Sequence, residues 1–243
     1  TFPSIIWECD SCRERCNLRR ADFPTGPELY CITDANLSGF SHEEQVARMI
    51  EGGARIIQLR DKAIDDEGFA QIATKCQALC RAAGVSFVVN DRIEVARAIS
   101  ADVLHLGQDD LPPAEARKII GEEMLLGIST HNFDQFVRAL REPVDYIALG
   151  PVFGTTTKQR PDPPPGMDAV REAATIMRDD RRPLVLIGGV TLENLEALQV
   201  IAPNAIIAVI GAIVGSPHSI AERVKEFRRR ICVPERTSFL NRQ

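Results

Sequence analysis

The sequence lacks any apolar run long enough to cross a membrane. Its longest run, Ala205 to Gly215, falls well short of the roughly 18–20 residues that a spanning helix needs. The amino-terminal residues also lack the basic and then apolar pattern of a secretory signal peptide. We therefore expect a protein that does not associate with membranes.

An excess of charge of one sign is also missing, because 29 Lys and Arg residues face 34 Asp and Glu residues, a formal net charge of −5. This near balance gives no support to a surface that coats nucleic acid. The composition, 44% hydrophobic and 26% charged, excludes a wholly disordered chain. We expect a globular protein with no nucleic-acid partner.

Cysteines are too few and too unevenly placed for a disulfide scaffold. The chain has seven in 243 residues, and three of them, Cys9, Cys12 and Cys16, lie near its start. Disulfide scaffolds are typical of small, cysteine-dense secreted chains, so we predict reduced thiols and a cytoplasmic protein. The three early cysteines have a spacing similar to a metal knuckle, but no histidine lies nearby to complete a zinc site.

The chain divides into an irregular start and a repetitive body. Residues 1–27 show no sustained period, and we predict that they form a poorly ordered extension, followed by one folded domain at 28–232 and a polar tail at 233–243. In the body, short runs rich in Ile, Val and Leu alternate with longer segments whose apolar residues recur at helical spacing. The expected strands are Leu29–Thr33, Arg55–Arg60, Ser86–Asn90, Val103–Leu106, Leu125–Ser129, Tyr146–Gly150, Leu184–Gly188 and Ala205–Ile210.

Eight strand-plus-helix units predict an α/β fold with an all-parallel sheet, because parallel neighbours need a crossover that a helix supplies. An open, doubly wound sheet is possible, but it typically has about five or six strands. Eight units favour closure into a single (β/α)8 barrel, the TIM barrel. In that fold the carboxyl ends of the strands form the active-site face, so the polar residues there are the candidates for function.

The second expected strand ends in a pair of cations. Side chains alternate along a strand, so Gln58, Arg60 and Lys62 share one face, while Ile57 and Leu59 share the other and meet the helices. The polar face then points into the barrel or its mouth. Two cations there are explained either by an internal network of ion pairs or by a seat for a phosphate or diphosphate.

Two acidic segments follow the next two strands. Asn90 and Asp91 end the third, and Asp109 and Asp110 follow the fourth, so carboxylates from adjacent strands can converge. Together with the cations and a phosphate they make an Mg²⁺ site plausible, because Mg²⁺ takes few protein carboxylates and completes its shell with substrate oxygens and water. The alternative is that Asp91 and Asp110 cap the helices that follow them.

The remaining strand ends carry hydroxyls, glycines and one histidine. Ser129, after the fifth strand, could contact substrate or cap a helix, and His131 could be a general base, although no partner is visible that would fix its tautomer. Thr155, Thr156, Thr157 and Lys158 follow the sixth strand as a polar loop or an oxyanion site. Glycines after strands seven and eight allow backbone N–H groups to approach a ligand, as in the recurrent phosphate site of the barrel; they include Gly189 and Gly211.

Taken in order, these segments resemble the thiamine-phosphate synthase family. The resemblance rests on Gln58–Lys62, Asn90-Asp91, His105–Asp110, Gly127–His131 and Gly150–Phe153 with Thr155–Lys158, and it covers about Leu29 to Ile231. It implies a barrel transferase that joins hydroxymethylpyrimidine diphosphate to thiazole phosphate, releases pyrophosphate and uses Mg²⁺. It also implies a dissociative substitution, which agrees with the absence of a convincing general base among the candidates. The implied partners are small molecules, and a homo-oligomer stays open.

The resemblance also implies roles for individual residues. Arg60, Lys62, Ser129 and Lys158 would be catalytic, and Asp91 and Asp110 would bind Mg²⁺. The pyrimidine diphosphate and thiazole phosphate would be bound by Gln58, Leu59, Arg60, Asp61, Lys62, Asn90, Ser129, Thr155, Thr156, Thr157, Lys158, Gly189, Ile210 and Gly211.

The last strand departs from the family pattern, and two other functions stay in view. The family usually has Val-Ser-Ala-Ile after this strand, where the chain has Ile210-Gly211-Ala212-Ile213, so one hydroxyl is missing while the backbone donors remain. A related thiazole tautomerase is one alternative, but it has no diphosphate to bind and does not need Gln58–Lys62. A non-catalytic sensor of a phosphorylated ligand is the other, but it does not need aspartates for a leaving-group metal.

Overall fold

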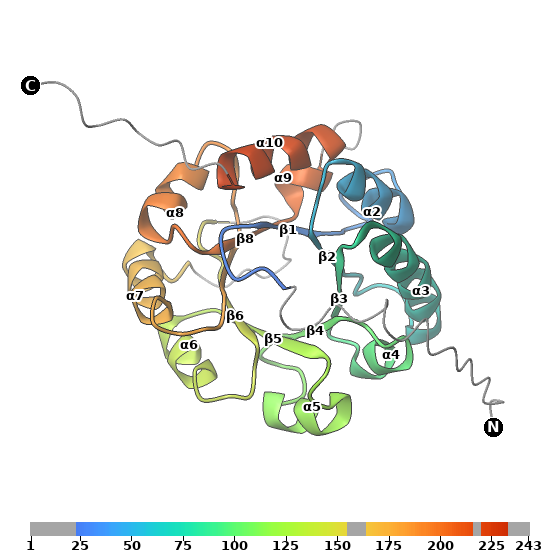
Figure 1. Cartoon of the computed structure of the whole chain (residues 1–243), viewed down its shortest axis with the longest axis horizontal. Helices are drawn as coiled ribbons and strands as arrows, with labels where there is room; N and C mark the ends of the chain where they lie inside the picture. Colours follow the sequence, from blue (N-terminus) through green and yellow to red (C-terminus); the bar gives the residue numbers. More distant parts are fainter. Residues whose placement is uncertain (1–22, 155–163, 216–219, 233–243) are drawn as a thin grey trace, which may run out of the picture.

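A computed structural model describes residues 23–154, 164–215 and 220–232. Its strands pair in parallel in chain order, and the last pairs with the first, so they close a barrel (Figure 1). The predicted (β/α)8 fold is therefore confirmed. The strands are β1 (Leu29–Ile32), β2 (Ile56–Leu59), β3 (Ser86–Asn90), β4 (Val103–Leu106), β5 (Leu125–Thr130), β6 (Tyr146–Leu149), β7 (Leu184–Ile187) and β8 (Ile206–Val209).

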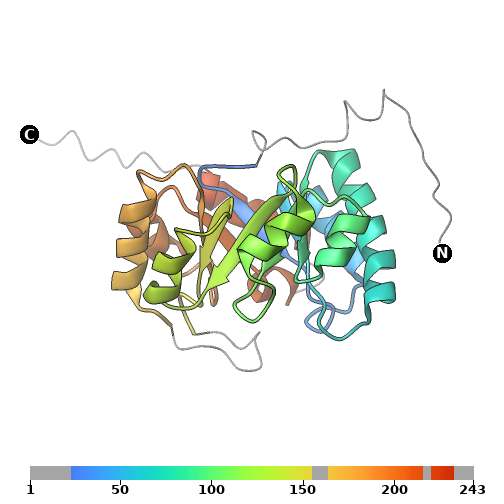
Figure 2. The same ribbon diagram turned by 90° about the horizontal axis from the view of Figure 1, so that it is seen from below.

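Helices surround the barrel as an outer ring (Figures 1 and 2). Several begin at a side chain that caps their free N–H groups: Ser41 forms a capping box with Glu44, and Asp65 and Asn132 cap the helices that follow them. The helices are α2 (His42–Glu51), α3 (Asp66–Ala83), α4 (Ile93–Ala98), α5 (Pro113–Ile120), α6 (Phe133–Ala139), α7 (Met167–Met177), α8 (Leu195–Ile201), α9 (Gly211–Val214) and α10 (Ile220–Cys232).

Strand alternation separates two hydrophobic clusters. Ile57 and Leu59 belong to the large cluster between the strands and the helices, whereas Ile56 belongs to the smaller cluster inside the barrel. The same division holds in β6, where Tyr146 points inward and Ile147 outward. The predicted directions of the β2 side chains are thus confirmed, and Gln58 lies inside the barrel, 2% exposed.

The segment before β1 lies across the amino-terminal end of the barrel (Figures 1 and 2). Phe23, at its start, is buried, and its ring stacks on that of Tyr146 with centroids 5.3 Å apart. The sequence-based boundary assigned Phe23 to a poorly ordered extension. In the structure its ring belongs to the smaller hydrophobic cluster inside the barrel and closes that cluster at the amino-terminal end. The packed domain therefore begins at Phe23 or before it, ahead of the predicted boundary at residue 28. Without this ring, the close packing of the barrel interior would be left open at its amino-terminal end.

Three cysteines in the described ranges, Cys31, Cys76 and Cys80, are free and buried. Burial raises the pKa of the Cys76 thiol to about 12 and raises those of the other two as well. They therefore pack as neutral apolar groups. Within the described part of the chain, none of the helices is both long and apolar enough to cross a membrane.

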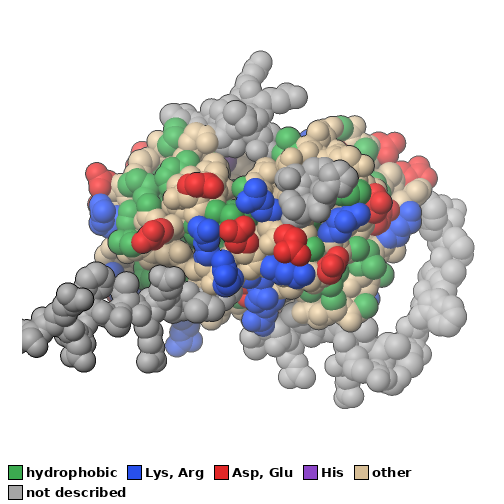
Figure 3. Space-filling model, turned by 90° about the horizontal axis from the view of Figure 1, so that it is seen from above, with side chains coloured by type: hydrophobic (Ala, Val, Ile, Leu, Met, Phe, Trp, Pro, Cys, Tyr) green, Lys and Arg blue, Asp and Glu red, His purple; other side chains and the backbone are tan. Residues whose placement is uncertain are grey.

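Basic and acidic side chains are interspersed on the face that includes α10 (Figure 3). Some of this mixing comes from ion pairs within α10, such as Arg223 with Glu226 and Lys225 with Glu222. These exposed pairs contribute little to stability, but they prevent a field of one sign on this face.

Removing the Phe23 ring tests its place in the core. We expect Phe23→Ala to lower the free energy of unfolding by about 3 kcal/mol, since a buried aromatic side chain is replaced by a cavity. Phe23→Leu, which keeps most of the volume, should cost about 1 kcal/mol. Urea denaturation measures both, and an alanine variant as stable as the parent protein would contradict the packing described above.

Candidate active site

A cavity of about 240 Å³, lined by both polar and apolar residues, opens at the carboxyl ends of the strands. Most of the predicted site residues in the described ranges line it, although they come from strands far apart in the sequence. They are Gln58, Arg60, Lys62, Asn90, Asp91, Asp110, Ser129 and Ile210. The closed barrel thus brings together the groups that the sequence predicted to converge.

Leu59 and Asp61 lie outside this cavity. Leu59 is fully buried between β2 and the helices, and the Asp61 carboxylate bonds to His42. Both positions follow from the alternation that sends Gln58, Arg60 and Lys62 the other way. Their side chains therefore hold the strand in place, and a substrate contact by either stays only a prediction from the family resemblance.

Each of the two cations on β2 and its following turn has a carboxylate partner. Arg60 Nη1 lies 3.8 Å from Asp34 Oδ2, and Lys62 Nζ lies 3.1 Å from Asp91 Oδ2. Ion pairs, the first of the two explanations offered for these cations, therefore exist. The Arg60 pair is long, however, and the Lys62 side chain is 64% exposed, so both cations can be reached by an anion entering the mouth.

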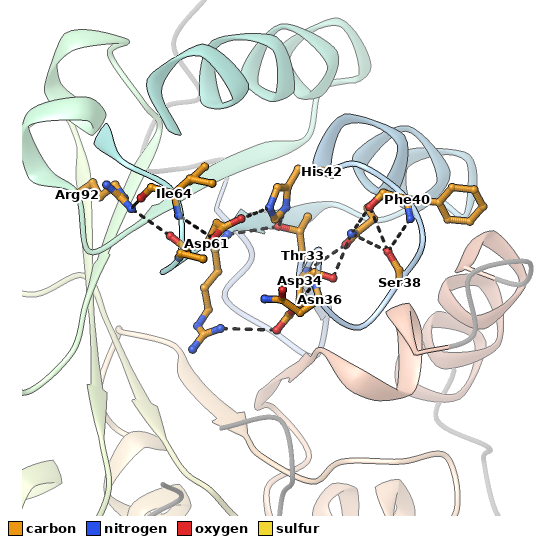
Figure 4. A network of polar contacts seen from close by, with 12 residues as sticks. Thr33, Asp34, Asn36, Ser38, Phe40, His42, Asp61, Ile64 and Arg92 are labelled. Atoms are coloured by element: carbon orange, nitrogen blue, oxygen red, sulfur yellow. Dashed lines mark hydrogen bonds and ion pairs between the residues drawn. The ribbon is translucent and has the colours of Figure 1, made fainter. Parts of the chain in front are cut away.

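A network behind β2 fixes the segment that carries these cations (Figure 4). The His42 ring bonds to Asp61 Oδ2 at 3.0 Å through Nε2 and to Thr33 Oγ1 at 2.8 Å through Nδ1, and Thr33 Oγ1 also accepts the Arg60 N–H. Burial raises the pKa of Asp61, but hydrogen bonds from His42 and from the Ala63 N–H outweigh it and hold that pKa below its usual range. Arg92 bonds to the Asp61 carbonyl from the far side.

The turn after β1 is held by the same region of the structure (Figure 4). Gln45 of α2 accepts the Asp34 N–H through its amide oxygen and donates to Ser38 Oγ and the Phe40 carbonyl through its amide nitrogen. Asp34 in turn accepts the Asn36 N–H. Because this turn is fixed to α2, the Asp34 carboxylate stays beside Arg60.

The two predicted metal ligands lie close together and cap no helix. The N-cap positions of α4 and α5 are Arg92 and Pro112, and neither helix has a side-chain cap, so the capping alternative fails for Asp91 and Asp110. Burial and the neighbouring Asp91 carboxylate raise the pKa of Asp110 against the opposing hydrogen bond from the Gly107 N–H.

The two neighbouring carboxylates repel each other, and a hard divalent cation between them would relieve this repulsion and receive the oxygen ligands that it prefers. Within the described ranges, no group of three or more His, Cys, Asp or Glu side chains is placed to hold a metal ion. A cation at Asp91 and Asp110 would therefore have to take its other ligands from a bound substrate and water.

Ser129 and His131 both have partners that the sequence did not reveal. Ser129 caps no helix, since Asn132 caps α6; its Oγ lies 2.8 Å from His105 Nε2, and its carbonyl accepts from Gln108. His131 Nδ1 lies 2.9 Å from the Gly150 carbonyl oxygen, which can only accept. That bond places the hydrogen of a neutral ring on Nδ1.

Sequence reasoning assigned no role to Tyr30 or His105, two polar residues that line the cavity. A signal existed for His105: Val103 and His105 alternate with Leu104 and Leu106, so the pattern of β4 already directs His105 inward. For Tyr30 only the observed register shows the inward direction, because Tyr30 pairs with Ile56 and Ala208, both of which face the interior.

A second cavity lies over β7 and β8, and its lining includes four glycines together with alanines and branched apolar residues. Gly189 has φ +64°, and a Cβ there would come 2.4 Å from the Gly154 carbonyl oxygen, so only glycine lets these two loops meet. Gly189, Ile210 and Gly211 line this cavity. The predicted residues Thr155, Thr156, Thr157 and Lys158 lie outside the described residues.

A (β/α)8 barrel with polar side chains gathered at the carboxyl ends of its strands, and glycines in the loops after the last two, is typical of barrel enzymes that act on phosphorylated ligands. Comparison with known proteins narrows this class. A model of the thiamine monophosphate synthase family matches residues 29–213. The chain belongs to this family.

Individual proteins that are similar to this chain carry names of the same family. The thiamine-phosphate synthase of Chloroflexus aurantiacus is 40% identical over 77% of this chain and 85% of its own, and that of Methanoregula boonei is 38% identical over 84% and 93%. The solved structure of thiamine phosphate pyrophosphorylase from Pyrococcus furiosus has a TM-score of 0.75 to this chain at 29% identity. It is matched over 84% of this chain and 95% of its own.

Asp91 is held in a backbone conformation that favours glycine, with φ +62°. Such a conformation costs a residue with a side chain on the order of 1 kcal/mol, and it is retained where function requires it. We therefore expect Asp91→Gly to be as stable as the parent protein or about 1 kcal/mol more stable in thermal unfolding without ligands. A clear loss of stability would show that Asp91 serves mainly to hold the fold.

Proposed function

We propose that this chain catalyses the coupling of hydroxymethylpyrimidine diphosphate with thiazole phosphate to give thiamine phosphate and pyrophosphate. It is then a transferase of thiamine biosynthesis, as the names of its relatives indicate. The observation that carries the proposal is the pairing of two cavities at one barrel mouth. One has cations and close carboxylates over β2 to β4, and the other has a glycine-lined wall over β7 and β8.

The first cavity suits the diphosphate that leaves. Arg60 and Lys62 provide a fork and a point charge for phosphate oxygens, and Ser129 offers a hydroxyl from β5. Asn90 lies beside them at the end of β3, where we place the pyrimidine. A bond that breaks with an anionic leaving group is accelerated chiefly by groups that stabilise the developing charge, and this wall supplies them.

Asp91 and Asp110 would hold Mg²⁺, which supplies charge neutralisation on the leaving diphosphate when bound. The observation that supports this assignment is the mutual repulsion of the two carboxylates, only partly relieved by Lys62. Lys62 then has two roles: it offsets the acidic pair before the substrate binds, and it can turn to the diphosphate afterwards.

The second cavity suits the phosphate of the thiazole substrate. Backbone groups near Gly189 and Gly211 form its wall, and we assign Thr155, Thr156, Thr157 and Lys158 to the same task. The thiazole nitrogen attacks with its own lone pair, so no side chain has to remove a proton from it. Positioning beside the pyrimidine is then what this wall contributes to the rate.

We also propose that the protein works in the cytoplasm. The three buried, free cysteines of the described ranges support this proposal, because a reducing compartment is where such thiols persist.

The function is tested by measuring pyrophosphate release from the purified protein. We expect release only when both substrates and Mg²⁺ are present, loss of release with EDTA, and recovery when Mg²⁺ is restored. Intact pyrimidine diphosphate in the complete mixture would overturn the proposal and favour the tautomerase or sensor alternative.

A matched pair of variants tests the acidic site. Asp110→Asn should lower kcat by about 100-fold or more, because the amide keeps the bond from Gly107 but removes the charge that holds the cation. Its neighbour Asp109 also lines the cavity and has no assigned role, so Asp109→Asn should leave kcat within about twofold of the parent. Equal losses in both variants would contradict the assignment of Asp110.

A further inference from the structure

A continuous chain of hydrogen bonds crosses the interior of the barrel from β2 to β5. Gln58 Nε2 donates to Tyr30 Oη at 2.7 Å, and the hydroxyls of Tyr30 and Tyr146 lie 3.2 Å apart. Tyr146 Oη lies 2.8 Å from His105 Nδ1, and His105 Nε2 lies 2.8 Å from Ser129 Oγ. The chain therefore ends at a hydroxyl in the wall of the active-site cavity.

All members of this chain except Ser129 are buried. Gln58, Tyr30, Tyr146 and His105 are each less than 10% exposed. Burial raises the pKa of both tyrosines above its ordinary value. Each phenol therefore keeps its hydrogen at neutral pH.

These hydrogens can be assigned one after another from Gln58. Its amide N–H can only donate, so Tyr30 Oη accepts there and passes its own hydrogen to Tyr146 Oη. Tyr146 then donates to His105 Nδ1, which leaves the ring hydrogen on Nε2 to bond Ser129 Oγ. With its oxygen already accepting, Ser129 has its hydroxyl hydrogen left to donate into the cavity that it lines. In the opposite direction, the Tyr30 oxygen would receive two hydrogens and its own would have no acceptor within this chain.

We infer that Tyr30, Tyr146 and His105 are positioning residues that orient the Ser129 hydroxyl as a hydrogen-bond donor to the leaving diphosphate. The inference rests on the proposed function for its catalytic consequence. A donor aimed in advance at the position where charge develops needs no reorganisation during the reaction. The interior of the barrel thus sets the direction of a bond at its mouth.

The direction of the chain can be measured without any turnover. Nitrogen-15 NMR of the labelled protein at neutral pH resolves which ring nitrogen of each of its four histidines carries hydrogen, and His105→Asn identifies the signals of His105. We expect hydrogen on Nε2 and an accepting Nδ1 whose resonance moves in Tyr146→Phe. Hydrogen on Nδ1 in the parent protein would overturn the inference, whatever the enzyme catalyses.

The catalytic consequence is tested with Tyr146→Phe, which removes one oxygen but keeps the ring between Phe23 and Gly127. We expect kcat to fall about tenfold, with KM for the pyrimidine diphosphate changed by less than about threefold, and Ser129→Ala to lower kcat by about 100-fold. In the Ser129→Ala background, Tyr146→Phe should have no further effect on kcat beyond about twofold. An unchanged tenfold loss in that background would overturn the inference.

Thr130→Val is the matched control. Thr130 neighbours Ser129, is fully buried, and donates its hydroxyl to the Ala148 carbonyl, but it takes no part in the chain. We expect it to lower stability without lowering kcat. If Thr130→Val and Tyr146→Phe lower kcat equally, the effect of Tyr146 is general destabilisation. If the parent protein releases no pyrophosphate at all, the proposed function fails, and the NMR measurement still decides the direction of the chain.

Discussion

Closure of eight parallel strands into one barrel brings their carboxyl ends to a single face, and the alternation of side chains then decides which residues can meet there. In β2 this alternation sends Ile57 and Leu59 to the helices and Gln58 to the interior. The cations of the mouth, the paired carboxylates and the hydroxyl of Ser129 all depend on the same constraint. A shift of one residue in any strand would exchange its core and site residues.

Tyr146, in the interior of the barrel, serves both the packing of the core and the hydrogen bonding of the site. Tyr146 stacks on Phe23 toward the amino-terminal end, while its hydroxyl bonds to His105 on the way to the mouth. The ring also explains Gly127 on the adjacent strand, because a Cβ there would lie 2.0 Å from the phenol carbon that bears the oxygen. The apolar ring fills the core, and its polar tip connects the core to the site.

Local pattern was enough to predict most of the fold. The bounds of β3 and β4 match those expected from periodicity, and the strand ends were sufficient to predict that Arg60, Lys62, Asp91 and Asp110 converge. Helix α9 was missed, because four residues beginning with glycine give no helical period. The place of Phe23 was also missed, since nothing near it in sequence indicates the distant ring on which it packs.

Long-range and conformational features of the site could not be predicted in the same way. The contact between Tyr30 and Tyr146 joins residues 116 positions apart, and it exists only once the barrel is closed. The positive φ of Asp91 is set by the packing of β3 and β4 around it, where its N–H bonds to the His105 carbonyl. The sequence left helix capping open for Asp91, Asp110 and Ser129, and only the observed caps exclude it.

The proposed activity requires one mouth to hold two anionic ligands at once, in two adjoining cavities that share Ile187, Gly188, Ala208 and Ile210. Calorimetric titration of pyrophosphate with Mg²⁺, with and without saturating thiazole phosphate, tests this most directly. We predict that one pyrophosphate binds per chain in both cases, with an affinity that changes by less than about threefold. An apparent affinity that falls in proportion to the thiazole phosphate concentration would mean that the two ligands compete for one site, and it would contradict the two-cavity assignment.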